Sequence, residues 1–396
     1  MAHMRTRIAL LLTSLMGLAL VNAPAASAAG GEGWVSYNPD PAHYATVLTH
    51  GYGHGIGLSQ WGAEYRARAG QTVDQILDFY YPGTTKGTST GPVRVWITGD
   101  KDHNTIVRPA AGLKVVDLGT RKSYLLPTSK GAKAWRLTFV SGKNRLAWLK
   151  DGVWHGYRPG GKLLTGAGQF RSTENLLNLY YAGSNHPYRG VLRLVAGRTI
   201  NVLSLENYLK GVVPAEVYTT WKPETLKSQA VAARTYAAFE RNANLDRSYQ
   251  ICDTAGCQVY KGYAAEVAST TAAVVATAGR VVLYKGALAF TQFSASNGGV
   301  TAKPGTPTPY LVGGRADTYD VYPVSDPRLG PKTKAKLEAA YPALGTLQAF
   351  QVTERDTDGR VLQVELDGSK AGTVLIKGTD LRSLMGLRST YFYFQA

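Results

Sequence analysis

The sequence predicts an α+β fold in which a β-rich module is inserted. Two patterns favour this class: segments with helical periodicity in both halves of the chain, and a central stretch of short β-type runs between turn residues. Composition agrees, because 44% of the residues are hydrophobic, enough for real cores, while 44 Gly and 18 Pro indicate many loops. We therefore divide the chain at residues 1–28, 29–92, 93–185 and 186–396.

Residues 1–28 have the pattern of a signal peptide. Arg5 and Arg7 precede an apolar run from Ile8 to Val21, and Ala26-Ser27-Ala28 forms a small-residue cleavage site. An uncleaved membrane anchor is the alternative, but the apolar run is short for a span. No later segment reaches about 18 unbroken apolar residues. We therefore expect a secreted protein with no transmembrane segment after cleavage.

Residues 29–92 begin as an extended lead-in and become helical. A Gly-rich stretch at 51–57 is followed by helix-like runs at 58–69 and 73–80, which end at the breaker pair Pro82-Gly83. Residues 84–91 are rich in Thr, Gly and Ser, and we interpret them as a linker.

Residues 93–185 are predicted to be an all-β module. Short β-type runs recur there between Gly, Asp, Lys and Asn, at 93–97, 113–118, 135–140, 146–149 and 153–157. The pattern leaves the ligand of this module open.

Residues 186–396 mix helices and strands. The firmest helix begins near Pro223, because Pro suits the first turn and Glu224 complements the helix dipole there. We expect a second helix at 264–278, a third near 380–385, a hairpin formed by 190–195 and 199–203, and strands at 281–284, 287–294, 352–355, 361–366, 372–376 and 389–394.

The chain is strongly basic, with a formal charge of +17 that falls to +15 once the two leader arginines are removed. Outside the cytoplasm such a protein meets anionic cell-wall polymers and lipid head groups. The Lys and Arg residues look spread along the chain, and no nucleic-acid-binding motif is present, so we expect no nucleic acid partner.

Two cysteines, Cys252 and Cys257, favour a disulfide bond in an oxidising compartment. Free thiols and a zinc site are the alternatives. A zinc site needs three or four ligands, and no His or third Cys lies near these two in the sequence, so we expect no metal.

Glu216 is the candidate catalytic residue. It follows Pro214, at what we interpret as a turn before the long helix, and its apolar neighbours Val212, Val213 and Val217 suggest partial burial. Burial raises the pKa of a carboxyl group, which then can donate a proton. The plainer interpretation is a surface Glu. Two rival carboxylates, Glu206 and Glu224, fit helix-start positions and are read as structural.

The stretch from Gly53 to Gly62, Gly-His-Gly-Ile-Gly-Leu-Ser-Gln-Trp-Gly, is a second candidate. It lacks the Gly-Lys-Ser/Thr ending of a phosphate loop, so we reject that function. His50 and His54 have the spacing of a helical zinc pair, but the glycines around them disfavour a helix. A hydrogen-bonded loop histidine is the alternative for His54.

Residues 294–299, Ser-Ala-Ser-Asn-Gly-Gly, form a small polar turn after a strand. They can be a tight loop alone, or a surface whose hydroxyl, amide and backbone N–H groups bind sugar hydroxyls and N-acetyl groups.

Five stretches in order resemble the sporulation stage II protein D (SpoIID/LytB) family: 206–216, 228–236, 258–262, 294–299 and 386–391. The resemblance covers about residues 188–396. It implies a cell-wall enzyme that cuts peptidoglycan glycan strands, with Glu216 as the essential acid. It also implies substrate contacts, which we place at His54, Ser59, Gln60, Arg234, Tyr260, Ser294, Ser296 and Asn297. Relatives that bind zinc use two Cys and a His, which this chain does not repeat.

The Gly-His-Gly stretch lies near the C-terminus in that family and lines the cleft, whereas here it lies near the N-terminus. Circular permutation is the simplest explanation, since the termini of compact domains often lie close together. Residues 29–92 would then be the permuted N-terminal part of the catalytic domain. We expect residues 53–81 to pack against the strand ending at Phe394 and the segment carrying Glu216.

The resemblance implies a lytic transglycosylase that cleaves MurNAc-β-1,4-GlcNAc bonds and leaves 1,6-anhydroMurNAc ends, without a cofactor, at the cell wall. Its substrate would be glycan strands, preferably free of stem peptides. The alternatives are a non-catalytic, wall-binding modulator of another cell-wall hydrolase, and a muramidase that uses water.

Overall fold

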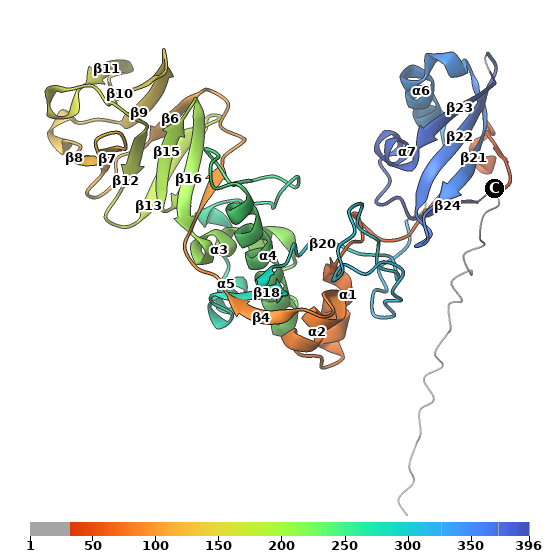
Figure 1. Ribbon diagram of the computed structural model, residues 1–396. Coiled ribbons are helices and arrows are strands. Elements are labelled where there is room, and N and C mark those ends of the chain that lie inside the picture. Colours follow the sequence, from red (N-terminus) through yellow and green to blue (C-terminus); the bar gives the residue numbers. More distant parts are fainter. Residues whose placement is uncertain (1–31, 326, 371, 396) are drawn as a thin grey trace, which may run out of the picture.

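The computed structural model describes residues 32–325, 327–370 and 372–395, so the signal peptide expected at 1–28 lies outside the described residues. The fold is α+β, as predicted. It consists of a β module, a central helical body and a C-terminal unit, with the central body between the other two (Figure 1).

The β module is built from two sheets whose inner faces share one core. One sheet has the order β17-β5-β16-β15-β12-β7-β8 and the other β11-β10-β9-β6-β13-β14. The core between them contains Leu137, Phe170, Leu179 and Leu192, all nearly inaccessible. The strands are β5 (Pro92–Trp96), β6 (Asn104–Val107), β7 (Lys114–Asp117), β8 (Lys122–Leu125), β9 (Ala134–Val140), β10 (Lys143–Lys150), β11 (Val153–Tyr157), β12 (Gly168–Arg171), β13 (Leu176–Tyr181), β14 (Ser184–Arg189), β15 (Val191–Val195), β16 (Arg198–Ser204) and β17 (Ile251–Cys252).

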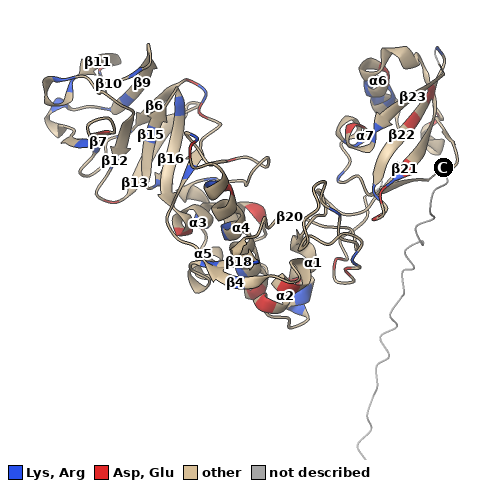
Figure 2. Ribbon diagram, viewed as in Figure 1, with Lys and Arg blue, Asp and Glu red and all other residues tan. Residues whose placement is uncertain are grey.

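Two expectations about this module are corrected. The boundary placed between residues 185 and 186 falls inside β14, and the hairpin β15–β16 continues the same sheet as β5 and β12. Nor are the basic residues evenly spread, because residues 93–185 hold 15 Lys and Arg against 5 Asp and Glu, a net charge of +10. Figure 2 shows the blue basic positions over this module and few red acidic ones.

The central body is organised around helix α4 (Pro223–Ala243). As predicted, Pro223 opens the helix, and its small residues Ala230, Ala233 and Ala237 are fully buried, which allows neighbouring helices to approach closely. Around it lie α3 (Leu205–Glu216), α5 (Ala268–Ala276), α1 (Gln60–Arg68), α2 (Val73–Tyr80), β3 (Leu58–Ser59), β18 (Arg280–Tyr284), β19 (Ala287–Leu288) and β20 (Phe293–Ser294).

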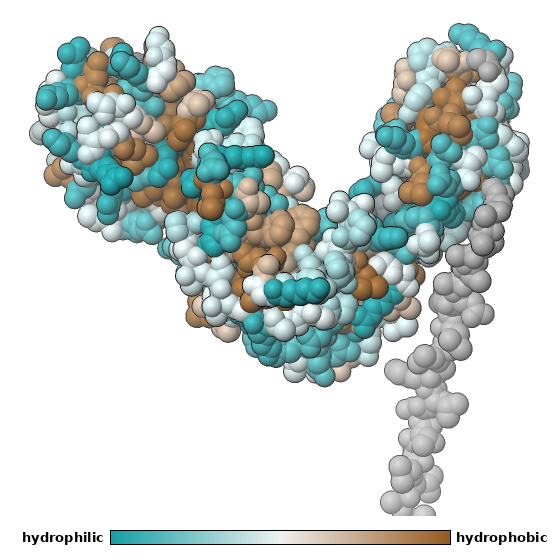
Figure 3. All heavy atoms as spheres, viewed as in Figure 1, coloured by the Kyte–Doolittle hydropathy of each residue, from teal (hydrophilic) through white to brown (hydrophobic). Residues whose placement is uncertain are grey.

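Residues 84–91 are more than a linker. They contain β4 (Thr85–Thr88), which pairs antiparallel with β18, and β3 pairs parallel with β20. The N-terminal segment is therefore hydrogen-bonded into the central body at two places. Its helices share a core with Val231 and Ala232 of α4. Figure 3 shows hydrophobic residues reaching the surface over the central body.

The C-terminal unit has its own core, formed mainly by Leu347, Phe350, Val364, Leu366 and Phe392. Its sheet has the order β1-β21-β22-β23, and β2 pairs antiparallel with β24. The elements are β1 (Val35–Ser36), β2 (Thr46–Thr49), α6 (Pro331–Ala340), β21 (Leu347–Arg355), β22 (Val361–Gly368), β23 (Gly372–Lys377), α7 (Gly378–Met385) and β24 (Phe392–Gln395). Helix α6 was not predicted, because Leu337 is the only one of its residues that is buried.

Candidate functional site

Glu216 is the last residue of α3, and the turn expected at Pro214 is instead the final turn of that helix. The proline is tolerated there, since it removes only one late intrahelical hydrogen bond. Val212 and Val213 are fully buried, which anchors the end of the helix, while Glu216 is partly exposed. The carboxyl group therefore sits where the helix meets the surface.

The environment of Glu216 favours its protonated form. Burial raises the pKa of the carboxyl group above its ordinary value. Two hydrogen bonds oppose part of this shift: the backbone N–H of Val259 donates to Oε1 at 2.7 Å, and the side chain of Gln60 also stabilises the carboxylate. The Gln60 amide donates as well to Oε1 of Gln229 at 3.4 Å. Gln60 thus lies beside Glu216, although the two are far apart in the sequence.

A cluster of aromatic side chains adjoins these two residues. Trp61 follows Gln60, and its ring lies 5.0 Å from the ring of Trp221, 6.0 Å from that of Tyr218 and 5.4 Å from that of Tyr322. Tyr218, two residues after Glu216, is 63% exposed. We call Trp61, Tyr218, Trp221 and Tyr322 the aromatic cluster. The sequence reasoning missed it, because its members come from three separate segments.

Tyr52 extends this surface. Its ring lies 6.4 Å from that of Tyr322, the residue is 49% exposed, and the guanidinium of Arg388 lies 6.0 Å from the centre of the ring. Tyr52, Arg382 and Arg388 also line a hollow of about 400 Å³ beside α7. Aromatic faces therefore continue from the neighbourhood of Glu216 towards this hollow.

The Gly-rich stretch is a tightly packed loop, and not a helix. A Cβ atom at Gly57 would lie 2.1 Å from the carbonyl oxygen of Gln292, and its φ of +68° favours glycine. Nδ1 of His54 accepts the backbone N–H of Ile56 at 2.9 Å. Desolvation and the charges of Arg382 and Arg360 lower the pKa of His54 to about 4, although the residue keeps an exposed surface. The imidazole is therefore neutral at physiological pH.

The N-terminal segment is hydrogen-bonded to the C-terminal part of the chain and to the segment after Glu216. The backbone N–H groups of His50 and Gly53 donate to the carbonyls of Tyr391 and Arg388, at 2.8 and 2.9 Å. Near Glu216, the backbone N–H of Lys222 donates to Oε2 of buried Glu64 in α1 at 2.9 Å. The strand ending at Phe394 is paired by β2, which precedes the expected range 53–81, whereas α1 within that range contacts the segment after Glu216.

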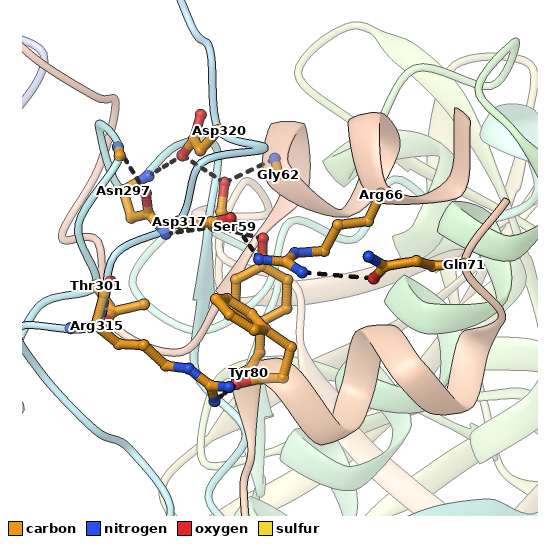
Figure 4. Close-up of polar contacts among 12 residues, drawn as sticks. Ser59, Gly62, Arg66, Gln71, Tyr80, Asn297, Thr301, Arg315, Asp317 and Asp320 are labelled. Carbon is orange, nitrogen blue, oxygen red and sulfur yellow. Dashed lines mark hydrogen bonds and ion pairs between the residues drawn. The ribbon is translucent and has the colours of Figure 1, made fainter. Parts of the chain in front are cut away.

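Three of the expected sugar contacts are buried in a polar network (Figure 4). The hydroxyls of Ser59 and Ser296 donate to the carboxylate of Asp320, at 2.8 and 2.9 Å, and the side-chain amide of Asn297 donates to Asp317 at 2.9 Å. All three residues are at most 1% exposed. Their hydrogen-bonding groups hold the fold together here, so we correct their assignment as substrate contacts.

The same network contains residues that sequence reasoning missed. The buried carboxylate of Asp317 accepts from Arg66 at 2.8 Å and from the hydroxyl of Tyr80 at 2.6 Å (Figure 4). The guanidinium carbon of Arg66 also lies 3.3 Å from the centre of the Phe79 ring. These contacts join α1 and α2 to the 297–320 loop. Only the three-dimensional packing reveals them, because Asp317 has no motif around it.

Ser294 and Arg234 are structural too. The hydroxyl of Ser294, 9% exposed, accepts the backbone N–H of Gly55 at 3.1 Å. Arg234 is fully buried, and its guanidinium donates to both oxygens of Glu206, at 2.9 and 2.8 Å, and to backbone carbonyls of Val274 and Arg280. A glycan cannot reach this side chain, so its assignment as a substrate contact is wrong. The ion pair with buried Arg234 agrees with the interpretation of Glu206 as a structural residue.

Tyr260 faces a different hollow. It is 4% exposed, its hydroxyl donates to the Asn201 side chain at 2.8 Å, and it lines a hollow of about 410 Å³ with Tyr188 and Asp253. Its hydroxyl is thus occupied by Asn201, and the hydrogen-bond partner of Glu216 in this segment is the backbone of Val259.

Cys252 and Cys257 form a disulfide bond, and Cys252 lies in β17 beside β5. The bond closes a short loop that ends two residues before Val259, the residue that donates to Glu216. Across the described part of the chain, no group of three or more His, Cys, Asp or Glu side chains is placed to hold a metal ion. Within that same part, no helix is both long and apolar enough to cross a membrane.

Residues 196–284, which contain α3, Glu216 and α4, match the family model SpoIID, Stage II sporulation protein. This chain resembles the SpoIID family. The matched segment does not include residues 53–62 or 294–299, so their roles rest on the geometry described above.

Three relatives extend the comparison. Stage II sporulation protein D of Bacillus amyloliquefaciens is 29% identical over 221 residues, which cover 50% of this chain and 62% of that protein. A protein named Amidase enhancer, from Bacillus subtilis (strain 168), is 39% identical over 116 residues, 28% of this chain and 15% of that protein. An uncharacterised protein of Brachyspira hyodysenteriae (strain ATCC 49526 / WA1) is 41% identical over 120 residues, 29% of this chain and 32% of its own length. This chain therefore spans less than two thirds of the length of each of these three relatives.

Proposed function

We propose that this protein is a cell-wall enzyme that cleaves the glycan strands of peptidoglycan as a lytic transglycosylase, with Glu216 as its acid and base. The observation that carries the proposal is Glu216 itself. It is a partly exposed carboxyl group with a raised pKa, next to exposed aromatic rings, in the segment that matches the SpoIID model. A general acid needs this combination of a raised pKa and access to the substrate.

The chemistry needs one recycled carboxyl group. Protonated Glu216 gives its proton to the glycosidic oxygen as the bond to the MurNAc C1 atom breaks, and the sugar acquires oxocarbenium-like character. The resulting carboxylate then takes the proton of the C6 hydroxyl, and that oxygen bonds to C1 to close the 1,6-anhydro ring. Glu216 ends the cycle protonated, and no water is consumed.

The surrounding carboxylates support a single-carboxylate mechanism. Glycosidases with two catalytic carboxylates need the second one free to act as a nucleophile or to activate water. Glu64, Asp317 and Asp320 are each at most 6% exposed and are hydrogen-bonded to structural partners. None of these three is free for such a role.

The aromatic cluster suits a sugar chain. Pyranose rings have apolar C–H faces, which stack on aromatic rings, while their hydroxyls stay in water. Tyr218 and Tyr52 are exposed enough to offer such faces on the surface near Glu216. We place glycan contacts at these two residues and at His54, whereas Gln60, only 5% exposed, acts by stabilising the Glu216 carboxylate.

The setting of the protein is part of the proposal. The relatives named Stage II sporulation protein D and Amidase enhancer support a role at the cell wall. The leader pattern of residues 1–28 supports secretion, and the contacts of residues 46–80 support the permutation. Peptidoglycan glycan strands would be the main partner, and other cell-wall hydrolases further ones.

A second candidate function is a modulator that binds the wall without cutting it. The relative named Amidase enhancer favours it. A muramidase that uses water is the third.

One digestion separates these functions. Purified glycan strands without stem peptides are incubated with the protein, and the products are analysed by mass spectrometry. A lytic transglycosylase gives anhydro ends, which are lighter than reducing ends by one water. A muramidase gives reducing ends, and a modulator gives no products. Glu354→Gln is the matched control for Glu216→Gln, because Glu354 is exposed on β21 in the C-terminal unit.

A further inference from the structure

Residues 93–185, which form most of the β module, carry most of the positive charge of the chain, and this charge is not neutralised internally. The whole sequence has a net charge of +17, and residues 93–185 contribute +10. Every residue of that range is described, and none of its Lys or Arg side chains forms an ion pair within 4.0 Å of a described carboxylate. The compensating charge must therefore come from solution or from a ligand.

Part of this charge lies on one face of a sheet. In the β9–β10 pair, Arg136 is opposite Ala147, Arg145 is opposite Thr138, and Lys143 is opposite Val140. Side chains two residues apart along a strand share a face, so the three cations lie on the same side of adjacent strands. The alternate residues Trp135, Leu137 and Leu146 are buried in the core. The three cations therefore face away from the partner sheet.

Aromatic rings support the arginines on this face. The guanidinium of Arg136 lies 4.1 Å from the centre of the Trp154 ring, and that of Arg108 lies 4.2 Å from the centre of the Tyr180 ring. Stacking on a ring holds a guanidinium flat and leaves its N–H edge available for oxygen atoms. Nε of Arg136 and Nη1 of Arg145 are buried, but the other guanidinium nitrogens of both residues remain accessible and form no hydrogen bond with described residues. We call Arg108, Arg136, Lys143 and Arg145, with Trp154 and Tyr180, the cationic face.

We propose that the cationic face binds a flexible phosphodiester polymer with a polyol backbone, of the kind that cell walls contain, and so holds the enzyme at its substrate. Charge complementarity selects a polyanion. A phosphate presents several oxygens to a guanidinium, which binds them in a bidentate manner. Neighbouring strands lie about 4.8 Å apart, so a flexible chain crossing β6, β9 and β10 meets one or more cations at each strand.

The choice of a wall polymer over a nucleic acid rests on the proposed cell-wall function. Binding to the cationic face can nevertheless be tested separately from catalysis. The cationic face belongs to the β module, whereas Glu216 lies at the end of α3 in the central body (Figures 1 and 2). Binding can therefore persist when cleavage is absent, and cleavage of short soluble glycans can persist when binding is lost.

The test uses the full chain and poly(glycerol phosphate) as the probe, with affinity measured by calorimetry at several salt concentrations. The triple variant Arg136→Gln, Lys143→Gln, Arg145→Gln should bind at least about tenfold more weakly. For this variant, the slope of the logarithm of the binding constant against the logarithm of salt concentration should be less steep by about 2. Each lost phosphate contact removes about 0.7 from that slope for a flexible strand. The control variant Lys332→Gln, Lys370→Gln, Lys377→Gln removes the same charge from exposed positions of the C-terminal unit and should bind as the wild type does.

Two further measurements complete the test. The pair Arg108→Gln, Lys143→Gln leaves Arg136 and Arg145 in place, and it should weaken binding even if the triple variant fails to fold. Polyglutamate and duplex DNA at equal charge serve as competitors. The proposal is overturned if the control variant loses as much affinity as the triple variant, or if either competitor binds more tightly than poly(glycerol phosphate). Normal cleavage of short glycans by a folded triple variant would show that the defect is in attachment and not in chemistry.

Discussion

The backbone N–H of Val259 donates a 2.7 Å hydrogen bond to Oε1 of Glu216. This bond ties the end of α3 to the segment that follows the disulfide loop. It stabilises the carboxylate, whereas burial destabilises it, and burial has the larger effect on the pKa of Glu216. The balance matters because the proposed reaction passes through both protonation states.

Replacing Glu216 by Gln should abolish glycan cleavage. The amide has the same shape but cannot donate the proton, and general acid–base catalysis contributes roughly 10²–10⁴-fold. Because burial disfavours the carboxylate in the folded protein, the neutral amide should leave the melting temperature unchanged or raise it at neutral pH. Product formation and thermal unfolding measure the two effects. Activity within a few fold of wild type would remove Glu216 from the mechanism.

Gln60→Met should move the alkaline limb of the pH–activity profile to higher pH. Gln60 stabilises the Glu216 carboxylate, so its loss raises the pKa of Glu216 and keeps the acid protonated further up the pH scale. Activity requires the protonated form and is therefore lost as pH rises through that pKa. Rates on soluble glycan across a pH series test this. A limb that stays in place or moves to lower pH contradicts the assigned hydrogen bond.

Arg66→Met should destabilise the fold strongly. The Asp317 side chain is fully buried, and breaking a buried pair by removing one partner costs about 3–5 kcal/mol. The control is Lys86→Met, whose pair with Asp74 is exposed and should contribute at most about 1 kcal/mol. Chemical denaturation of both variants gives the comparison. Equal losses would show that the buried network does not stabilise the contact between α1, α2 and the 297–320 loop.

Deleting the chain up to Gly91 should unfold or inactivate the protein. The deletion removes β4, α1 and α2, exposes Val231 and Ala232 of α4, and takes Gln60 away from Glu216. A dispensable tail would leave activity intact. Circular dichroism, together with the glycan digest, distinguishes the two results.

Reducing the Cys252–Cys257 disulfide should lower activity more than it lowers stability. The bond closes a short loop, which contributes less chain entropy than a long one, about 2 kcal/mol, and the loop lies just before Val259, which donates to Glu216. Oxidised and reduced protein differ by two hydrogens in mass, which verifies the redox state. Unchanged activity after verified reduction would show that Val259 is positioned by other contacts.

The local elements could be predicted from the sequence because their signals are local. The limits of α2 and the start of α4 agree with the residues expected from periodicity and proline position. The sugar contacts could not be predicted in the same way. Ser59, Ser296 and Asn297 look like surface polar residues, and only the fold shows that Asp317 and Asp320 lie among them. The assignment of Arg234 as a substrate contact was wrong for the same reason, because its partner Glu206 lies on another helix.

The pairing of β2 with β24 constrains the order in which the protein can fold. Residues 46–80 leave the ribosome early, but their partners in α4, in the 292–320 loop and in β24 follow much later. Until then Ile76, Leu77 and Tyr80, which end almost fully buried, have nothing to cover them. Contacts of such high sequence separation form slowly, and a chain waiting for them is prone to aggregate. The yield of active protein should therefore depend on how well residues 46–80 are shielded by chaperones during synthesis.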